Sequence, residues 1–194
     1  IYLKLAQETL ARGKSVLYLV PEIALSRQLE DRISETFPEL LVFHSGETMV
    51  RKRDVAAALR HCASAKDINE YLDVSQNTNV KKDSASEDTL TIKASSSEAI
   101  EKTNHHGYVV LGTRSAIFLP HRDLGLVIVD EEHDTSYKQD SPAPRYNGRE
   151  TAIMMAKIFG ANVILGSATP SLESLYNCSV GRYGLVTLNK RFYD

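Results

Sequence analysis

The sequence is poor in the residues that mark membrane, secreted or zinc-built proteins. It contains no tryptophan and only two cysteines, Cys62 and Cys178, which could form at most one disulfide and cannot build a four-cysteine zinc site. No apolar run reaches the ~18 residues that a membrane-spanning helix needs, and the first residues lack the layout of a secretory signal. We therefore expect free thiols, no membrane contact and a cytoplasmic location.

The sequence also lacks a strong charge of either sign. Its 23 basic and 25 acidic residues give a net charge of −2, so the overall charge does not indicate a nucleic-acid-binding protein, although a local basic face would be compatible with it. The six histidines show no H-x-x-x-H spacing, which argues against a histidine-built metal site. The chain opens with Ile1 inside a helical pattern, which predicts a piece cut from a longer protein.

A complete phosphate-binding loop is missing as well. Gly13, Lys14 and Ser15 resemble the end of the Walker A pattern, but Glu8 stands where that pattern requires glycine, and a strand follows where it requires a helix. No G-x-x-x-x-G-K-[ST] occurs in the 194 residues. The triplet is therefore a coincidental match.

Short aliphatic runs alternate with amphipathic stretches along most of the chain. Strands are predicted at 16–20, 41–43, 108–111, 124–129 and 163–165, and helices at 1–12, 23–36, 149–159 and 171–176. Nearly uninterrupted aliphatic strands indicate burial on both faces, as in parallel sheets covered by helices. The predicted fold class is α/β, with a parallel sheet flanked by helices. Residues 62–104 are polar and break this rhythm, so we expect a mobile insertion there; a small helix at 66–73 plus a hairpin at 90–93 is the alternative.

An acidic tetrad, Asp130, Glu131, Glu132 and His133, follows the strand at 124–129. Strand geometry would send Asp130 and Glu132 to one face and Glu131 and His133 to the other, unless a turn redirects them. A carboxylate at a strand end suits Mg²⁺, and a neighbouring glutamate can orient a hydrolytic water. A solvated acidic turn is the alternative interpretation.

A turn of small residues, 166–170 (GSATP), follows the strand at 163–165. Its hydroxyl groups could bond a carboxylate or phosphate, or the turn could simply lead into a helix capped by Ser171 or Thr169. Because ligands bind outside the carboxyl ends of parallel strands, both the turn and the acidic tetrad are predicted to border one site. Beyond the tetrad, Tyr137, Lys138, Arg145 and Tyr146 combine charges and aromatic rings that could contact nucleic acid; an ordinary surface loop is the alternative.

Six segments carry a resemblance to a known family, in this order along the chain: LVPEIALSRQL at 19–29, FHSG at 43–46, GTRSAIFLP at 112–120, LGLVIVDEEHDTSYKQ at 124–139, RYNGRETA at 145–152 and GSATPSLESL at 166–175. Together they resemble the primosomal replication-restart helicases, which are superfamily 2 DNA helicases. The resemblance covers residues 1–61 and 105–190 and leaves out 62–104. It implies that residues 1–194 form a single partial ATP-binding domain, the first RecA-like lobe of a 3′-to-5′ helicase.

The resemblance also implies cofactors and partners. ATP and Mg²⁺ would be the cofactors, with zinc only in parts of the longer protein outside this chain. The partners would be single-stranded and forked DNA and other primosome and replication-restart proteins. Because the Walker A lysine and the second motor lobe lie outside these residues, we expect the chain alone neither to hydrolyse ATP nor to unwind DNA.

The resemblance assigns roles to individual residues. Asp130 would hold Mg²⁺ through water, and Glu131 would position the attacking water. The residues that would couple hydrolysis to strand movement are Glu132, His133, Gly166, Ser167 and Thr169. Those that would face DNA are Pro21, Glu22, Arg114, Ser115, Tyr137, Lys138, Arg145 and Tyr146. Two alternatives stay open: a non-catalytic nucleic-acid-binding or protein-docking module, and another superfamily 2 translocase, such as a restriction translocase or a branch-migrating helicase.

Overall fold

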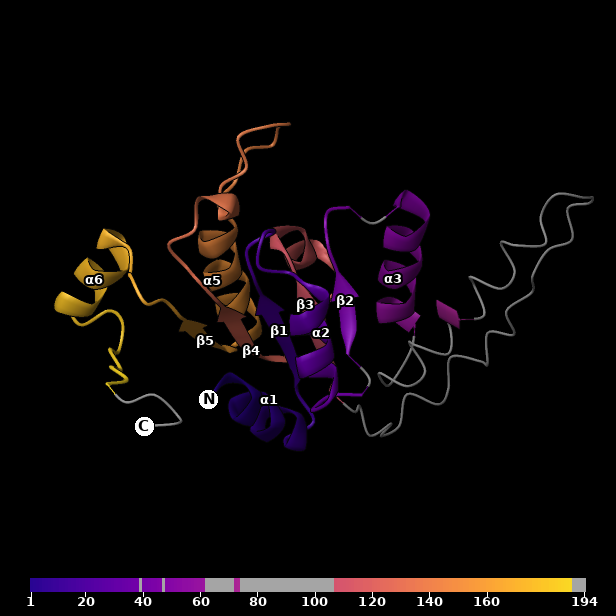
Figure 1. Ribbon diagram of the computed structural model, residues 1–194, viewed down its shortest axis with the longest axis horizontal. Helices are drawn as coiled ribbons and strands as arrows, with labels where there is room; N and C mark the ends of the chain where they lie inside the picture. The colour runs from indigo at the N-terminus through magenta and orange to yellow at the C-terminus, as the bar shows by residue number, and fades with distance from the viewer. Residues whose placement is uncertain (39, 47, 62–71, 74–106, 190–194) are drawn as a thin grey trace, which may run out of the picture.

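A computed structural model describes residues 1–38, 40–46, 48–61, 72–73 and 107–189. Within them the chain forms one parallel sheet of five strands: β1 (Ser15–Leu19), β2 (Leu41–Phe43), β3 (Val109–Gly112), β4 (Leu124–Val129) and β5 (Asn162–Leu165). The strand order is β2-β3-β1-β4-β5 (Figure 1). The α/β class and the parallel sheet predicted from the aliphatic runs are confirmed. The insertion predicted at 62–104 lies outside the described residues, apart from residues 72–73.

Helices cover both faces of the sheet (Figure 1). Alternate residues of β1 define the faces: Val16 and Tyr18 pack with the core residues of α1 (Tyr2–Ala11) and α2 (Arg27–Ser34). Leu17 and Leu19 pack on the opposite side with those of α3 (Met49–His61), the 3₁₀ helix η1 (Arg114–Phe118) and α5 (Gly148–Phe159). β1 and β4 are buried along their whole length. This two-sided burial is the reason that their sequences are almost purely aliphatic.

Helix ends follow local capping chemistry. α2 is shorter than the predicted 23–36, because the Ser26 hydroxyl accepts a hydrogen bond from the Leu29 N–H and so fixes the start of the helix at Arg27. The helix predicted at 171–176 forms as α6 (Leu172–Ser179), capped by Ser171. α5 ends at Phe159 and is capped by Gly160, the helix stop predicted from the sequence. Cys178 is a free thiol, and Cys62 lies outside the described residues. None of the described helices combines the length and apolar character needed to cross a membrane.

Candidate functional site

The backbone joins the acidic tetrad to the turn of small residues beyond the ends of β4 and β5. The Gly166 N–H donates to the Val129 carbonyl at 2.9 Å, and the Glu132 N–H donates to the Gly166 carbonyl at 3.0 Å. The two segments therefore lie side by side at the carboxyl edge of the sheet. The proximity predicted from parallel strand topology is confirmed.

A tight turn directs the tetrad's side chains. Glu131 has a φ of 46°, in the left-handed region that a residue with a side chain seldom adopts, at a cost on the order of 1 kcal/mol. The chain leaves the extended conformation after Val129, so the four side chains do not alternate between the faces of a strand. The turn that sequence analysis allowed for is present, and it spreads the side chains over three separate groups of contacts.

Asp130 is held by two phenols. Its Oδ1 accepts from the Tyr2 hydroxyl at 3.4 Å, and its Oδ2 accepts from the Tyr18 hydroxyl at 3.2 Å. Burial, followed by the charge of Asp130, raises the pKa of Tyr2 to about 12 and raises the pKa of Tyr18 as well. Both phenols therefore stay protonated and donate to the carboxylate at neutral pH. The two tyrosines were not predicted as site residues, because they lie in α1 and β1, far from Asp130 in sequence.

Gly166 permits close packing beside Asp130. A Cβ at this position would collide with the Tyr2 hydroxyl and lie 3.4 Å from Oδ1 of Asp130. Glycine thus lets the backbone of the small-residue turn approach the carboxylate. This gives a steric reason for a glycine as the first residue of the turn.

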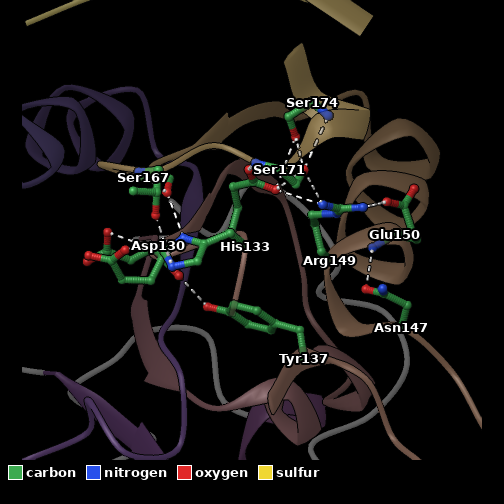
Figure 2. A network of polar contacts seen from close by, with 12 residues as sticks. Asp130, His133, Tyr137, Asn147, Arg149, Glu150, Ser167, Ser171 and Ser174 are labelled. Carbon is green, nitrogen blue, oxygen red and sulfur yellow. Dashed lines mark hydrogen bonds and ion pairs between the residues drawn. The ribbon is translucent and has the colours of Figure 1, made fainter. Parts of the chain in front are cut away.

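His133 connects the tetrad to the hydroxyl groups of the turn (Figure 2). Its Nδ1 lies 2.7 Å from the Ser167 Oγ, and its Nε2 lies 3.3 Å from the Thr169 Oγ1. Nδ1 also lies 3.5 Å from Oε2 of Glu131. The imidazole thus lies within reach of both hydroxyls and of the neighbouring carboxylate.

Glu132 is the acceptor of a buried polar network whose donors, Arg149, Ser171 and Ser174, are labelled in Figure 2. Its side chain is 1% exposed, and it accepts from the Arg149 guanidinium at 2.7 Å and from the Ser171 N–H at 2.7 Å. The Ser171 and Ser174 hydroxyls each donate at 3.0 Å. Burial alone would raise the pKa of Glu132, but these bonds outweigh it and hold the pKa below its ordinary value. Arg149 and Ser174 are contacts that sequence analysis missed.

The predicted DNA-facing residues occupy different environments. Pro21 is buried and Glu22 is exposed, whereas Lys138 and Arg145 extend to solvent. Arg114 donates through Nη1 to the carbonyls of Ser136 and Lys138, both at 2.9 Å, and so ties η1 to the loop. Ser115 and Tyr146 are both half-buried. Among the described residues, the buried Oγ of Ser115 has no hydrogen-bond partner.

Tyr137 departs from its predicted place on an exposed surface. The residue is 2% exposed, and its hydroxyl donates to the Asp130 carbonyl at 2.7 Å. The short helix η2 (Thr135–Tyr137), capped by the Asp134 carboxylate, turns the ring inward. A buried ring cannot stack on a base in this conformation, so its contact is structural: it supports the backbone of Asp130.

The carboxylates of the tetrad suit Mg²⁺ held mainly by water and phosphate. Within the described part of the chain, no three histidine, cysteine, aspartate or glutamate residues gather into a protein-built metal cage. Mg²⁺ in nucleotide sites takes one or two carboxylates and keeps several waters. The half-exposed Asp130, oriented by its two phenols, fits that requirement.

The chain is similar to one protein family and to several curated proteins. The family model described as "Type III restriction enzyme, res subunit" matches residues 1–172. The chain belongs to this family. Among curated proteins this res-subunit family member is similar to "Replication restart protein PriA" of Rickettsia felis, with 38% identity over 193 residues, covering 99% of this chain and 23% of that protein. The resemblance to replication-restart helicases is thereby confirmed.

Relatives from other bacteria carry the same name. The chain is 38% identical over 191 residues to the PriA of Chlamydia trachomatis, covering 98% of this chain and 20% of that protein. It is 33% identical over 192 residues to the PriA of Bacillus subtilis, covering 98% of this chain and 18% of that protein. The chain therefore spans only about a fifth of the length of these relatives. The solved DUF1998 helicase MrfA matches with a TM-score of 0.25 and 15% identity over 93% of this chain and 28% of that one, which is too distant to inform the fold.

Proposed function

We propose that this chain is a RecA-like motor lobe of an ATP-dependent, 3′-to-5′ DNA helicase that acts in replication restart. One observation carries the proposal: the acidic tetrad and the hydroxyl-bearing turn are joined by backbone hydrogen bonds and by the His133–Ser167 contact at the carboxyl edge of a parallel sheet. Ligands of open α/β sheets bind at this edge. The names of the PriA relatives supply the replication-restart part of the proposal.

In the proposed reaction Asp130 and Glu131 have different roles. Asp130, oriented by Tyr2 and Tyr18, would hold Mg²⁺ through water. Glu131, whose side chain is 47% exposed, would orient the attacking water and accept its proton. Bound Mg²⁺-ATP would supply a terminal phosphoryl group whose negative charge is neutralised by the metal.

The polar contacts around the tetrad support a role in coupling. His133 reaches Ser167 and Thr169, and Glu132 reaches Arg149 and Ser171, so the same turn is held from both sides. A change at the phosphate would alter these contacts and move the turn. We propose that this movement links hydrolysis to translocation along DNA.

The DNA-facing surface would lie beside this junction. Tyr146 lies close enough to Arg114 and Glu22 for both charges to influence its pKa, which burial raises. These residues come from three separate segments, and Lys138 and Arg145 add exposed positive charge. Such a combination suits phosphates and unpaired bases. The longer protein's forked-DNA substrate, primosome partners and zinc belong to the same proposal.

The family description favours a second candidate, a restriction-type DNA translocase. Both candidates use the same lobe, and they differ in what the rest of the longer protein contains. Paired cysteines beyond the start of the second motor lobe would favour the replication-restart helicase. Their absence, with a nuclease domain instead, would favour the translocase.

The test compares the longer natural protein with the 194-residue chain. Phosphate release by the longer protein should be stimulated by single-stranded DNA and lost in Asp130→Asn, while Asp31→Asn, an exposed acid of α2, should keep it. The isolated chain has no Walker A lysine and should release no phosphate. DNA-stimulated hydrolysis that survives Asp130→Asn would contradict the proposed role of the tetrad.

A further inference from the structure

Phe118 is a large aromatic side chain that the fold leaves in solvent. It ends η1 and is 63% exposed. Its ring meets the ring of Tyr146 edge-to-face, with centroids 4.9 Å apart and an interplanar angle of 81°. A T-shaped pair covers only a single ring face between its two members. The exposure of Phe118 means that apolar ring surface stays open to water.

The fold fixes this aromatic pair in place. A Cβ at Gly148 would lie 3.0 Å from the Cβ of Arg114 and 3.3 Å from Cδ1 of Tyr137, so only glycine lets the start of α5 approach η1 this closely without adjustment. Arg114 meanwhile binds the loop through the Ser136 and Lys138 carbonyls. Figure 1 shows this loop, which ends at Tyr146, projecting beyond the N-terminal end of α5. The aromatic pair therefore lies where η1 meets the end of a protruding loop.

The charges around the pair distinguish it from the other exposed apolar residues. Arg114 and Glu22 act on Tyr146, and Lys138 and Arg145 are exposed in the same loop. Three of these four groups are cationic, and the loop also carries one exposed acid, Asp140, whose Oδ1 lies 3.7 Å from Nζ of Lys138. Ile158 of α5 is 79% exposed but has no aromatic ring, and it belongs to neither ring pair found among the described residues. Aromatic faces among cations are the combination with which proteins bind single-stranded nucleic acid.

We propose that Phe118 and Tyr146 form a stacking platform for one unpaired base of single-stranded DNA, with the phosphates on either side of that base held by Arg145 and Lys138. This rests on the proposed function, which assigns DNA binding to the chain, and it adds Phe118 as the residue that takes the base. Stacking needs only the face of a base, so the platform accepts any sequence.

The absence of tryptophan from the chain provides a direct probe. In Phe118→Trp the new indole is the sole tryptophan, and stacking on a thymine base should quench its fluorescence when oligo(dT) is added. The matched control, Ile158→Trp on exposed α5, should show no quenching at the same oligo(dT) concentration. Equal quenching in both variants, or none in either while oligo(dT) binds, would overturn the proposal.

Affinity measurements separate stacking from charge. Phe118→Ala should weaken oligo(dT) binding about tenfold, at the lower end of what one stacked base contributes, and should leave the salt dependence unchanged. Phe118→Tyr should bind as the unmodified chain does, whereas Phe118→Leu, which keeps apolar bulk without an aromatic face, should bind as weakly as Phe118→Ala. Arg145→Ala should instead reduce the salt dependence. Urea unfolding of each variant checks that the fold is intact.

The outcomes distinguish this inference from the proposed function. If the unmodified chain binds oligo(dT) and Phe118→Ala binds equally well, the stacking platform is wrong while DNA binding stands. If Phe118→Leu binds as tightly as the unmodified chain, the contact is apolar and not a stack, which also overturns the inference. If the unmodified chain does not bind oligo(dT) at all, the proposed DNA-binding role of the chain fails, and this inference fails with it.

Discussion

Arg149 donates from Nη1 to Oε2 of the buried Glu132 at 2.7 Å, and this ion pair ties the start of α5 to the acidic tetrad. Arg149 follows the aromatic and basic loop by three residues, so the pair also connects that loop to β4. The same guanidinium reaches Ser171 Oγ at 2.7 Å and Glu150 at 2.7 Å. Loop, tetrad and α6 thus meet at one side chain.

Replacing Arg149 should destabilise the protein strongly. In Arg149→Ala the Glu132 carboxylate keeps its serine donors but loses its only counter-ion among the described contacts, and breaking such a buried pair costs about 3 kcal/mol. Urea unfolding followed by circular dichroism measures the loss. The control Arg145→Ala, on an exposed side chain, should change the free energy of unfolding by about 0.5 kcal/mol or less.

A double variant separates charge from packing. Adding Glu132→Gln to Arg149→Ala removes the unpaired charge and should recover part of the lost stability. Strict additivity of the two single changes would mean that Arg149 contributes through packing alone.

The buried His121 should make stability depend on pH. Burial lowers the pKa of His121, although the bond to the Ala116 carbonyl partly opposes this. The unfolded chain therefore takes up a proton near pH 6.5 that the folded chain does not, so the free energy of unfolding falls as pH drops below 6.5. The contribution is at most about 1.4 kcal/mol per pH unit. Above pH 6.5 the contribution of His121 to the free energy of unfolding should not change with pH.

Denaturant titrations between pH 7.5 and pH 5 measure this slope, at roughly half-unit steps around the ordinary histidine pKa. His121→Gln should flatten it. The matched control His133→Gln leaves the His121 ring untouched and should show the same slope of unfolding free energy against pH as the unmodified chain. An unchanged slope in His121→Gln would assign the pH dependence to another group.

Replacing Tyr137 should lower the stability of the fold and leave the affinity for DNA unchanged. Tyr137→Phe removes the hydroxyl that donates to the Asp130 carbonyl at 2.7 Å and leaves that partly buried acceptor without this bond, which costs about 1 kcal/mol. The folded variant should bind oligo(dT) as the unmodified chain does, since the ring is 2% exposed. A large loss of DNA affinity with unchanged stability would restore the exposed placement predicted from the sequence.

Ser167 should matter for coupling and little for folding. Ser167→Ala removes the 2.7 Å contact with His133 at an exposed position, so stability should change by less than about 0.5 kcal/mol. In the longer protein, DNA-stimulated phosphate release should fall about tenfold, as expected for one lost hydrogen bond. The control Ser34→Ala, on α2 and far from the tetrad in sequence, should leave hydrolysis unchanged.

Most of the sheet could be predicted because burial on both faces leaves a plain mark in the sequence. Runs such as 124–129 contain only aliphatic residues and glycine, and parallel topology then places Glu132 beside Gly166. The start of α2 was missed because amphipathic periodicity extends upstream of Ser26, whose capping hydroxyl decides where the helix begins. Periodicity locates an element, and local hydrogen bonds set its ends.

The supporting residues of the site could not be predicted because no local pattern records them. Tyr2 and Tyr18 reach Asp130 from α1 and β1 across a long sequence separation. Tyr137 lies in a polar stretch that reads as a surface loop, yet the capped turn of η2 buries its ring. In the sequence, Arg149 is an ordinary charged residue at the start of a helix. Its pairing with Glu132 depends on the tertiary fold, which brings the two side chains together.

The order of the strands has a consequence for biosynthesis. β1 lies at the centre of the sheet, but its two neighbours are β3 and β4: Val16 pairs with Val109 and Leu126. The ribosome must therefore synthesise the chain through β4 before the apolar strand β1 can pair on both of its edges. Until then the unpaired edges of β1 are prone to aggregation. We therefore expect the nascent chain to depend on holdase chaperones during translation.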